Sequence, residues 1–140
     1  NQGVVALMQG NVEEAEELFT AAMGAGDVVN YNLGIVKIIQ GDYEEAASYF
    51  GNANHFNNAL VQELQMDYDA AMSTLNALDA ESAKVAYLKA VVAANQDQDE
   101  LVFENLRVAV AQDSELKERA KVDMEFAKYF ENDTFNSIVE

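Results

Sequence analysis

The feature that most constrains this chain is an internal repeat. Residues 3–22 (GVVALMQGNVEEAEELFTAA) align with residues 34–53 (GIVKIIQGDYEEAASYFGNA) at an offset of 31, and two fainter copies follow at further offsets of 25 and 31. A unit of this length that recurs in tandem is typical of solenoids, in which each copy buries its apolar face against its neighbours. The sequence therefore predicts four copies of one structural unit, at about residues 1–23, 28–53, 54–78 and 81–111.

Residues of matched size recur at equivalent positions in the four copies. The rows are Gly3, Gly34, Ala59 and Ala90; then Ala15, Ala46, Ala71 and Val102; and then Phe19, Phe50, Leu75 and Leu106. The small side chains of the first two rows let helix backbones approach closely, and the large side chains of the third row fill the remaining space. The rows therefore predict packed helices with these residues in their core.

Turn residues divide each copy into two helices. At each break Asn or Asp supplies the N-cap oxygen of the next helix, and in the first two copies a glycine before it supplies the left-handed C-cap. The pairs at these breaks are Gly10-Asn11, Gly41-Asp42 and Met66-Asp67, and residues 95–100 take this place in the fourth copy. The chain has no proline and is half apolar, which favours an all-α globular protein. We expect helices at residues 1–9, 12–23, 28–40, 43–50, 54–65, 68–77, 81–94 and 98–111.

These motifs resemble the tetratricopeptide repeat. The hallmarks of that family are a Leu-Gly pair in the first helix, a turn glycine with Asp or Asn, and Ala, Phe and Ala along the second helix. The second copy carries them as Leu33-Gly34, Gly41-Asp42, Ala46, Phe50 and Ala53. The resemblance covers about residues 1–116 and implies a right-handed α-α superhelix of about four hairpins. The offsets are shorter than the period that is usual in the family, so we expect a tighter or less regular superhelix.

Residues 115–131 follow the last copy and combine an apolar face with a charged stripe. This pattern predicts one capping helix, which a solenoid needs to cover its open end, and a short turn at residues 134–139 follows it. We expect residues 1–140 to form a single domain. Because the chain starts at Asn1 in what reads as the middle of a helix, we also expect it to be a piece of a longer protein.

The formal charge is −17, and Lys37 is the only cation before Lys84, against thirteen carboxylates in the same stretch. Such a surface repels phosphate backbones and anionic lipid headgroups. No apolar run approaches the roughly 20 residues needed to span a bilayer. We therefore expect no nucleic-acid partner and no direct membrane insertion. A basic partner would be steered to the first half, although the simpler interpretation is a solvated surface that keeps the protein soluble.

The resemblance also implies where a partner would bind. The first helices of successive units line the concave face of such a solenoid, and by resemblance an aromatic row and an asparagine row face this groove. The expected groove residues are Tyr31, Asn32, Ile35, Phe56, Asn57, Leu60 and Tyr87. We expect them to bind a peptide or an amphipathic helix of a partner protein, with the asparagines pairing with its backbone. The lysines or arginines with which the family clamps a C-terminal carboxylate are absent, so that ligand class is not predicted.

Other interpretations of the same residues stay open. The segment 28–40 is apolar almost all round, which indicates burial on both sides, under the capping helix or against a second copy of the chain. The protein would then be a structural spacer or a homo-oligomerisation domain with a self-filled groove. It would alternatively be an accessory domain of an enzyme. The amino-acid composition of the repeats also resembles that of repeat domains in bacterial envelope-associated proteins. This resemblance implies the periplasm or cell envelope, with the cytoplasm as the alternative.

No catalytic or metal-binding pattern emerges from the sequence. Cysteine is absent and His55 is the only histidine, so neither a nucleophile–base pair nor a zinc ligand set is offered. The run 95–100 (NQDQDE) matches the first ligands of a helix–loop–helix calcium site, but Glu100 stands where glycine is required and Leu106 where the last glutamate is required. We therefore expect a binding protein with no cofactor and no enzymatic activity.

Overall fold

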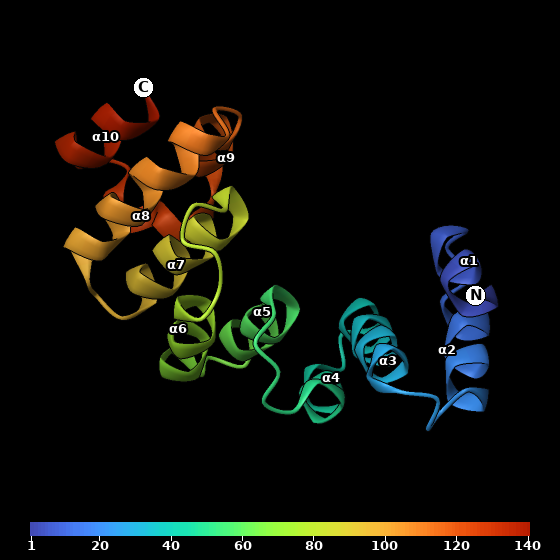
Figure 1. Ribbon diagram of the computed structural model, residues 1–140. Coiled ribbons are helices and arrows are strands. Elements are labelled where there is room, and N and C mark those ends of the chain that lie inside the picture. Colours follow the sequence, from blue (N-terminus) through green and yellow to red (C-terminus); the bar gives the residue numbers. More distant parts are fainter. The chain divides into compact units, whose positions relative to one another are not determined.

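The computed structural model describes all 140 residues, and it contains helices and no β-strand (Figure 1). The helices are α1 (Gln2–Met8), α2 (Val12–Ala21), α3 (Asp27–Gln40), α4 (Tyr43–Phe50), α5 (Phe56–Leu64), α6 (Tyr68–Asn76), α7 (Ala83–Asn95), α8 (Asp99–Gln112), α9 (Leu116–Val122), the 3-10 helix η1 (Met124–Tyr129) and α10 (Asp133–Val139). The prediction of an all-α protein is confirmed. None of these helices combines the length and the apolar character that crossing a bilayer requires.

The chain forms two compact units. The first comprises Asn1–Ala53 with Leu64–Met66, and the second comprises Asn54–Glu63 with Asp67–Glu140. Helices that follow one another along the chain pack against each other within these units, as α1 does with α2, α3 with α4, and α7 with α8. The neighbouring helices α5 and α6 are joined by a hydrogen bond of 2.7 Å from the Thr74 hydroxyl to the Gln62 side-chain oxygen.

The same backbone turn closes all four helical hairpins. One residue after each first helix is left-handed: Gly10 (φ 80°), Gly41 (φ 78°), Met66 (φ 62°) and Asp97 (φ 57°). The next residue donates its N–H to the carbonyl five positions back, at 2.8–3.0 Å, in the pairs Asn11 to Ala6, Asp42 to Lys37, Asp67 to Gln62 and Gln98 to Ala93. This is the Schellman motif, which satisfies carbonyls left over at the helix end. The turns predicted from the repeat are therefore confirmed in every copy.

The N-caps that follow these turns are confirmed in two hairpins and wrong in one. The side chains of Asp42 and Asp67 accept the backbone N–H of Glu45 at 3.1 Å and of Ala70 at 3.3 Å. Asn11 makes no such bond. Its amide nitrogen instead donates to the Glu14 carboxylate at 3.4 Å, because an amide, unlike a carboxylate, can act as a donor.

Glycine packs directly against phenylalanine in both hairpins of the first unit. A methyl group added to Gly3 would lie under 3.0 Å from three ring carbons of Phe19, and one added to Gly34 would meet the Phe50 ring in the same way. Both phenylalanines are buried. The expected packing of small residues against large ones is therefore present, and it is close enough that even alanine does not fit without movement.

Lys37 joins three helices of the first unit. From α3, its ammonium lies 2.8 Å from the Glu16 carboxylate of α2 and 2.7 Å from the Glu45 carboxylate of α4. Gln40 also donates to Glu16, at 2.7 Å. The hydrogen bond from Lys37 lowers the pKa of Glu16 below its ordinary value. The one cation of the acidic first half therefore offsets carboxylates of two successive hairpins.

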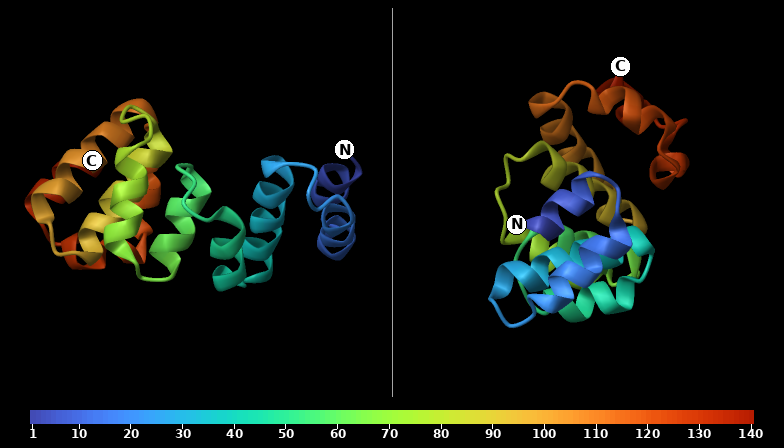
Figure 2. Two further views of the ribbon diagram at one scale, coloured as in Figure 1. Left: turned by 60° about the horizontal axis from the view of Figure 1, so that its bottom comes forward. Right: turned by 90° about the vertical axis from the view of Figure 1, so that its right-hand side faces the viewer.

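Helix α7 is the centre of the second unit. It contacts α6, α8 and η1, and the views in Figures 1 and 2 show α7 and α8 side by side, with the C-terminal elements folded against them. Most of its side chains are buried as a result. Phe126 and Phe135 from the C-terminal segment lie in the same core as Ala59, Leu75 and Leu106 of the repeats. The C-terminal segment thus completes the core of this unit.

The single helix expected at residues 115–131 is wrong, because it is interrupted at Asp123. This residue is extended (φ −76°, ψ 114°), and its carboxylate accepts the N–H of Glu125 at 3.1 Å. An aspartate that bonds to nearby backbone competes with helix continuation. The break changes the faces of the segment: Met124, expected on the apolar face, is 75% exposed, whereas Phe126 and Tyr129 are buried. The turn expected at 134–139 is the short helix α10.

The contact between Gly34 and Phe50 makes a testable prediction about stability. We expect Gly34→Ala to destabilise the protein by about 1–3 kcal/mol through overpacking, and Phe50→Leu to destabilise it by a similar amount through a cavity. The double variant should lose much less than the sum, because the third and fourth copies carry Ala with Leu at the same positions. Urea denaturation of the four proteins measures the coupling, and additive losses would contradict the pairing.

Met66 makes a second prediction. A left-handed conformation costs a residue with a Cβ about 1–2 kcal/mol, and the Met66 side chain is exposed, so that no packing is lost when it is removed. We expect Met66→Gly to raise the free energy of unfolding by about 0.5–1 kcal/mol after the greater entropy of glycine in the unfolded chain is subtracted. Met66→Ala is the control and should give no gain, because it keeps the Cβ. Thermal denaturation compares the two.

Candidate functional site

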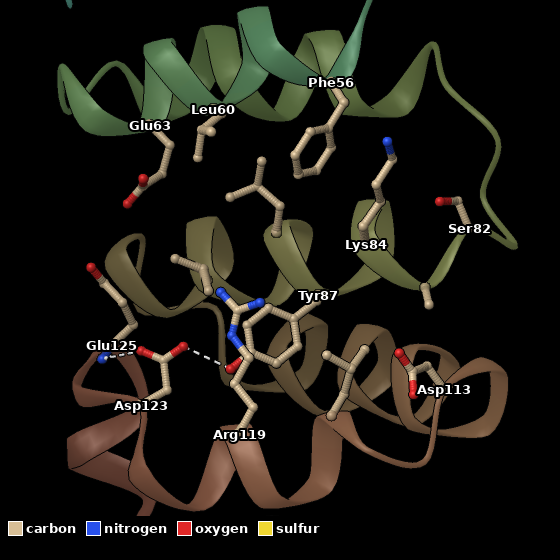
Figure 3. Close-up of a pocket in the computed structure, with 14 residues that line it drawn as sticks. Phe56, Leu60, Glu63, Ser82, Lys84, Tyr87, Asp113, Arg119, Asp123 and Glu125 are labelled. Atoms are coloured by element: carbon tan, nitrogen blue, oxygen red, sulfur yellow. Dashed lines mark hydrogen bonds between the residues drawn. The ribbon is translucent and has the colours of Figure 1, made fainter. Parts of the chain in front are cut away.

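A cavity of about 630 Å³ lies within the second unit (Figure 3). Its walls are the first helices of the third and fourth copies, α5 and α7, together with α9 and the beginning of η1. The residues that line it are Phe56, Leu60, Glu63, Ser82, Ala83, Lys84, Tyr87, Leu88, Val91, Asp113, Leu116, Arg119, Asp123 and Glu125. The repeats and the C-terminal segment therefore line the site together.

One wall of the cavity is apolar. Phe56 and Leu60 stand on one face of α5, and Leu88 and Val91 stand on one face of α7, because residues three or four positions apart share a helix face. Leu116 adds to this surface from α9. Phe56 and Leu60 are only partly buried. The wall thus offers apolar surface to whatever enters the cavity.

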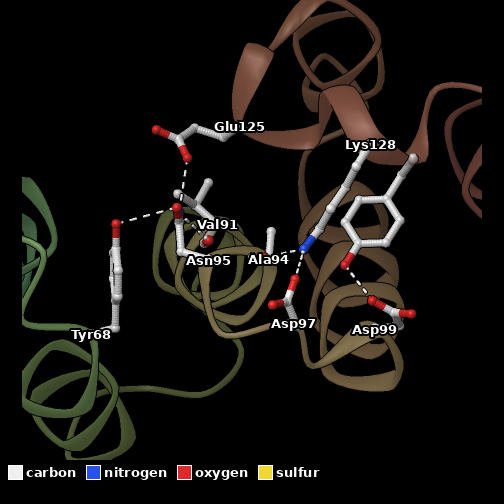
Figure 4. Close-up of polar contacts among 9 residues, drawn as sticks. Tyr68, Val91, Ala94, Asn95, Asp97, Asp99, Glu125 and Lys128 are labelled. Carbon is white, nitrogen blue, oxygen red and sulfur yellow. Dashed lines mark hydrogen bonds and ion pairs between the residues drawn. The ribbon is translucent and has the colours of Figure 1, made fainter.

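Two carboxylates at one end of the cavity are held by the protein. Asp123 accepts the Tyr87 hydroxyl at 2.7 Å and the Glu125 N–H at 3.1 Å. Glu125 accepts the side-chain amide of Asn95 at 2.9 Å, and the Asn95 oxygen in turn accepts the Tyr68 hydroxyl at 3.2 Å (Figure 4). These hydrogen bonds fix the positions of both carboxylates.

Glu63 is the third carboxylate at this end, and Figure 3 shows it facing the cavity. It is 9% exposed, and no hydrogen bond or ion pair holds its carboxyl. Burial raises its pKa above the ordinary value, and the nearby charges of Glu125 and Asp123 raise it further. Its carboxyl oxygens still reach solvent, since no buried side-chain oxygen lacks a hydrogen-bond partner, but partial loss of hydration and the neighbouring charges disfavour its charged form. Glu63 is therefore placed at an energetic cost to the folded protein.

The two cations that line the cavity lie against aromatic rings. The Lys84 ammonium is 4.8 Å from the ring centroid of Phe56, and the Arg119 guanidinium is 4.6 Å from that of Tyr87. Such cation–π contacts are favourable at these distances. Tyr87 also packs edge-on against Phe126, at 5.5 Å between ring centroids. Its pKa is raised by burial and by its hydrogen bond to Asp123.

The structure brings three of the seven predicted groove residues together in this cavity. Phe56, Leu60 and Tyr87 all line it. Tyr87 is 4% exposed and its hydroxyl is bound by Asp123, so it forms part of the wall that the C-terminal segment covers. Asn57 is half-buried on α5 and does not line the cavity.

The other three predicted groove residues belong to α3 in the first unit. Tyr31 is 39% exposed, and its ring centroid is 6.0 Å from that of Phe50. Asn32 and Ile35 are half-buried. These residues share one helix, as their spacing predicts, and belong to the first unit, whereas the cavity belongs to the second.

The charged lining was not among the predicted site residues. A sequence signal existed for Glu63, because it follows Phe56 and Leu60 at helical spacing. Arg119, Asp123 and Glu125 had none, since they come from the segment that was expected to be one straight helix. Arg119 lies in α9, before the break, whereas the place of Asp123 and Glu125 at the cavity depends on the break at Asp123.

The histidine and the acidic run have structural roles. His55 accepts the N–H of Asn58 in the first turn of α5 at 3.0 Å, and burial lowers its pKa. Asp97 forms an ion pair with Lys128, and Asp99 accepts the Tyr129 hydroxyl at 2.6 Å (Figure 4). Lys128 also donates to the Ala94 carbonyl at 2.6 Å. The run 95–100 thus ties the α7–α8 turn to η1, and no cluster of three or more acidic, histidine or cysteine side chains is arranged to hold a metal ion.

No protein-family model matches the sequence, and no curated protein matches it. What the cavity binds has therefore to be inferred from its own geometry and charge.

The raised pKa of Glu63 makes a prediction about pH. A carboxyl whose folded pKa lies above its unfolded value of 4.5 favours the folded state less as pH rises from the unfolded pKa through the folded one. Glu63→Gln removes this loss. We expect the variant to be as stable as the wild type near pH 4 and more stable at pH 7, measured by urea denaturation at both values. A variant that is less stable at pH 7 would show that the charged form of Glu63 stabilises the fold.

Proposed function

We propose that the protein is a tetratricopeptide-like interaction module that binds a peptide or helix of a partner protein in the cavity of the second unit. The observation that carries the proposal is the cavity itself, with its apolar wall on α5 and α7 and its charged end. A concave, mostly apolar site with a few fixed polar groups is the usual form of a ligand pocket, and 630 Å³ lies within the usual range.

The recurrence of the hairpins supports a solenoid. The Schellman turn recurs at the repeat spacing, and glycine packs on phenylalanine in both hairpins of the first unit. We propose that the hairpins stack in a right-handed superhelix, as the tetratricopeptide resemblance implies. The first helices would then carry the binding residues, with Tyr31, Asn32 and Ile35 as a further contact surface for the same or another partner segment.

A second candidate is a structural spacer or homo-oligomerisation domain with a self-filled groove. The burial of Tyr87 under Asp123, Arg119 and Phe126 favours it, because the C-terminal segment here occupies space that an open groove would leave to a partner. The space that remains at Phe56 and Leu60 favours the first candidate, since self-filling leaves it empty.

A random peptide library displayed on phage tests the proposal. We expect the wild type to enrich a set of related peptides, and Leu60→Gln to lose them by at least about tenfold, because it places a polar group on the apolar wall. The matched control is Leu101→Gln, which changes a leucine of α8 outside the cavity and should retain the peptides. Circular dichroism checks that both variants fold.

Two results would contradict the proposed function. If no related peptides are enriched, or if Leu60→Gln and Leu101→Gln retain them equally, the cavity is not the binding site, and the spacer becomes the better proposal.

A further inference from the structure

We infer that the cavity of the second unit recognises a cationic side chain, arginine or lysine, that lies next to an apolar residue in the partner chain. The inference rests on the proposed function and names the chemistry of the segment that the site selects. Glu63, Asp123 and Glu125 would receive the cation, and the wall of Phe56, Leu60, Leu88 and Val91 would receive the apolar neighbour.

The charges that line the cavity favour a cation. Four carboxylates line it against two cations, and both cations lie on aromatic rings at the cavity wall. Figure 3 shows Glu63, Asp123 and Glu125 gathered at one end and Lys84 toward the other, with the Arg119 guanidinium between them at the Tyr87 ring. The formal charge of −17 adds an attraction at longer range. The acidic end of the cavity therefore attracts a positive group, and the protein supplies none of its own to Glu63.

Glu63 is the observation that points to a ligand. It is nine-tenths buried and faces the cavity without a hydrogen-bond partner. No buried side-chain oxygen of the protein lacks a hydrogen-bond partner, so the Glu63 carboxyl oxygens are open to the cavity, where a donor from a ligand can reach them. Other charged residues near this cavity are engaged: Asp123 accepts two hydrogen bonds and Glu125 accepts one. A donor from a bound partner would complete the set.

A guanidinium or ammonium suits this end better than a metal ion. The acidic side chains here do not converge into a group that could hold a metal. A guanidinium carries five donors in a plane, and an ammonium carries three, so either can bond to carboxylates that stand apart. The aliphatic stem of such a side chain would lie along the apolar wall while its charged head reaches the acidic end. Both parts of the cavity would then be used.

Binding of a cation would also remove the cost of burying Glu63. Its pKa is raised because burial and two neighbouring carboxylates disfavour its charged form. A positive charge at hydrogen-bond distance favours that charged form. The free energy that the folded protein loses at Glu63 would therefore be recovered in the complex, and a cationic donor recovers more of it than a neutral one.

The phage library is selected on three proteins to test the inference. These are the wild type, the double variant Glu63→Gln with Glu125→Gln, and a control with Glu104→Gln and Glu131→Gln. The control changes two exposed carboxylates outside the cavity and so has the same net charge as the double variant. We expect peptides with Lys or Arg beside an apolar residue to be enriched on the wild type and the control, and this basic preference to be lost on the double variant.

Calorimetry on the most enriched peptide completes the test. Replacement of its basic residue by norleucine should weaken binding to the wild type by at least about tenfold, as loss of a charge-assisted hydrogen bond does, and should change binding to the double variant little. Enriched peptides without basic residues, or equal losses on the control and the double variant, overturn the inference and leave the peptide-binding function standing. A selection that enriches no peptides overturns both.

Discussion

The left-handed residue that closes each hairpin determines which faces of its two helices meet. In all four hairpins, the small residue of the first helix stands seven positions before it and the large residue of the second helix stands nine positions after it, as Gly34 and Phe50 do around Gly41. With the same turn and the same spacings, the glycine meets the phenylalanine ring in both hairpins of the first unit. The shortest of the three repeat offsets leaves these spacings intact. It falls between the second and third copies, where the chain passes from the first unit to the second.

This regularity explains which parts of the fold could be predicted. The helices of the four copies, their turns and their buried rows follow from contacts between residues that are close in the sequence, and such contacts leave a periodic trace in it. The repeat spacing alone locates the turns at Met66 and Asp97, although neither residue is a glycine. The segment 115–131 could not be placed, because its apolar residues fit one helix as well as two shorter pieces. The carboxylate of Asp123, which caps the second piece, decided between them, and a single aspartate carries little weight against a pattern that extends over the whole segment.

The candidate site was predictable only where it belongs to the repeat. Phe56, Leu60 and Tyr87 stand on first helices, so their common surface followed from the resemblance, whereas the acidic end joins residues up to 62 positions apart. Glu63 reaches it from α5, Asp123 from the break itself and Glu125 from just after it. No periodicity links such residues. Their meeting depends on how the C-terminal segment packs on α7, through Phe126 against Tyr87 and Lys128 against the Ala94 carbonyl.

The C-terminal segment therefore has two consequences that oppose each other. It buries Phe126 and Phe135 and so completes the core of the second unit, which stabilises the fold. It also brings two carboxylates near the buried Glu63, which destabilises the fold. A glutamine in place of Glu63 would keep the packing and avoid the repulsion. Natural proteins tolerate such losses of stability. What distinguishes Glu63 is that its carboxyl faces the cavity, where the proposed basic side chain would offset both the repulsion and the lost hydration.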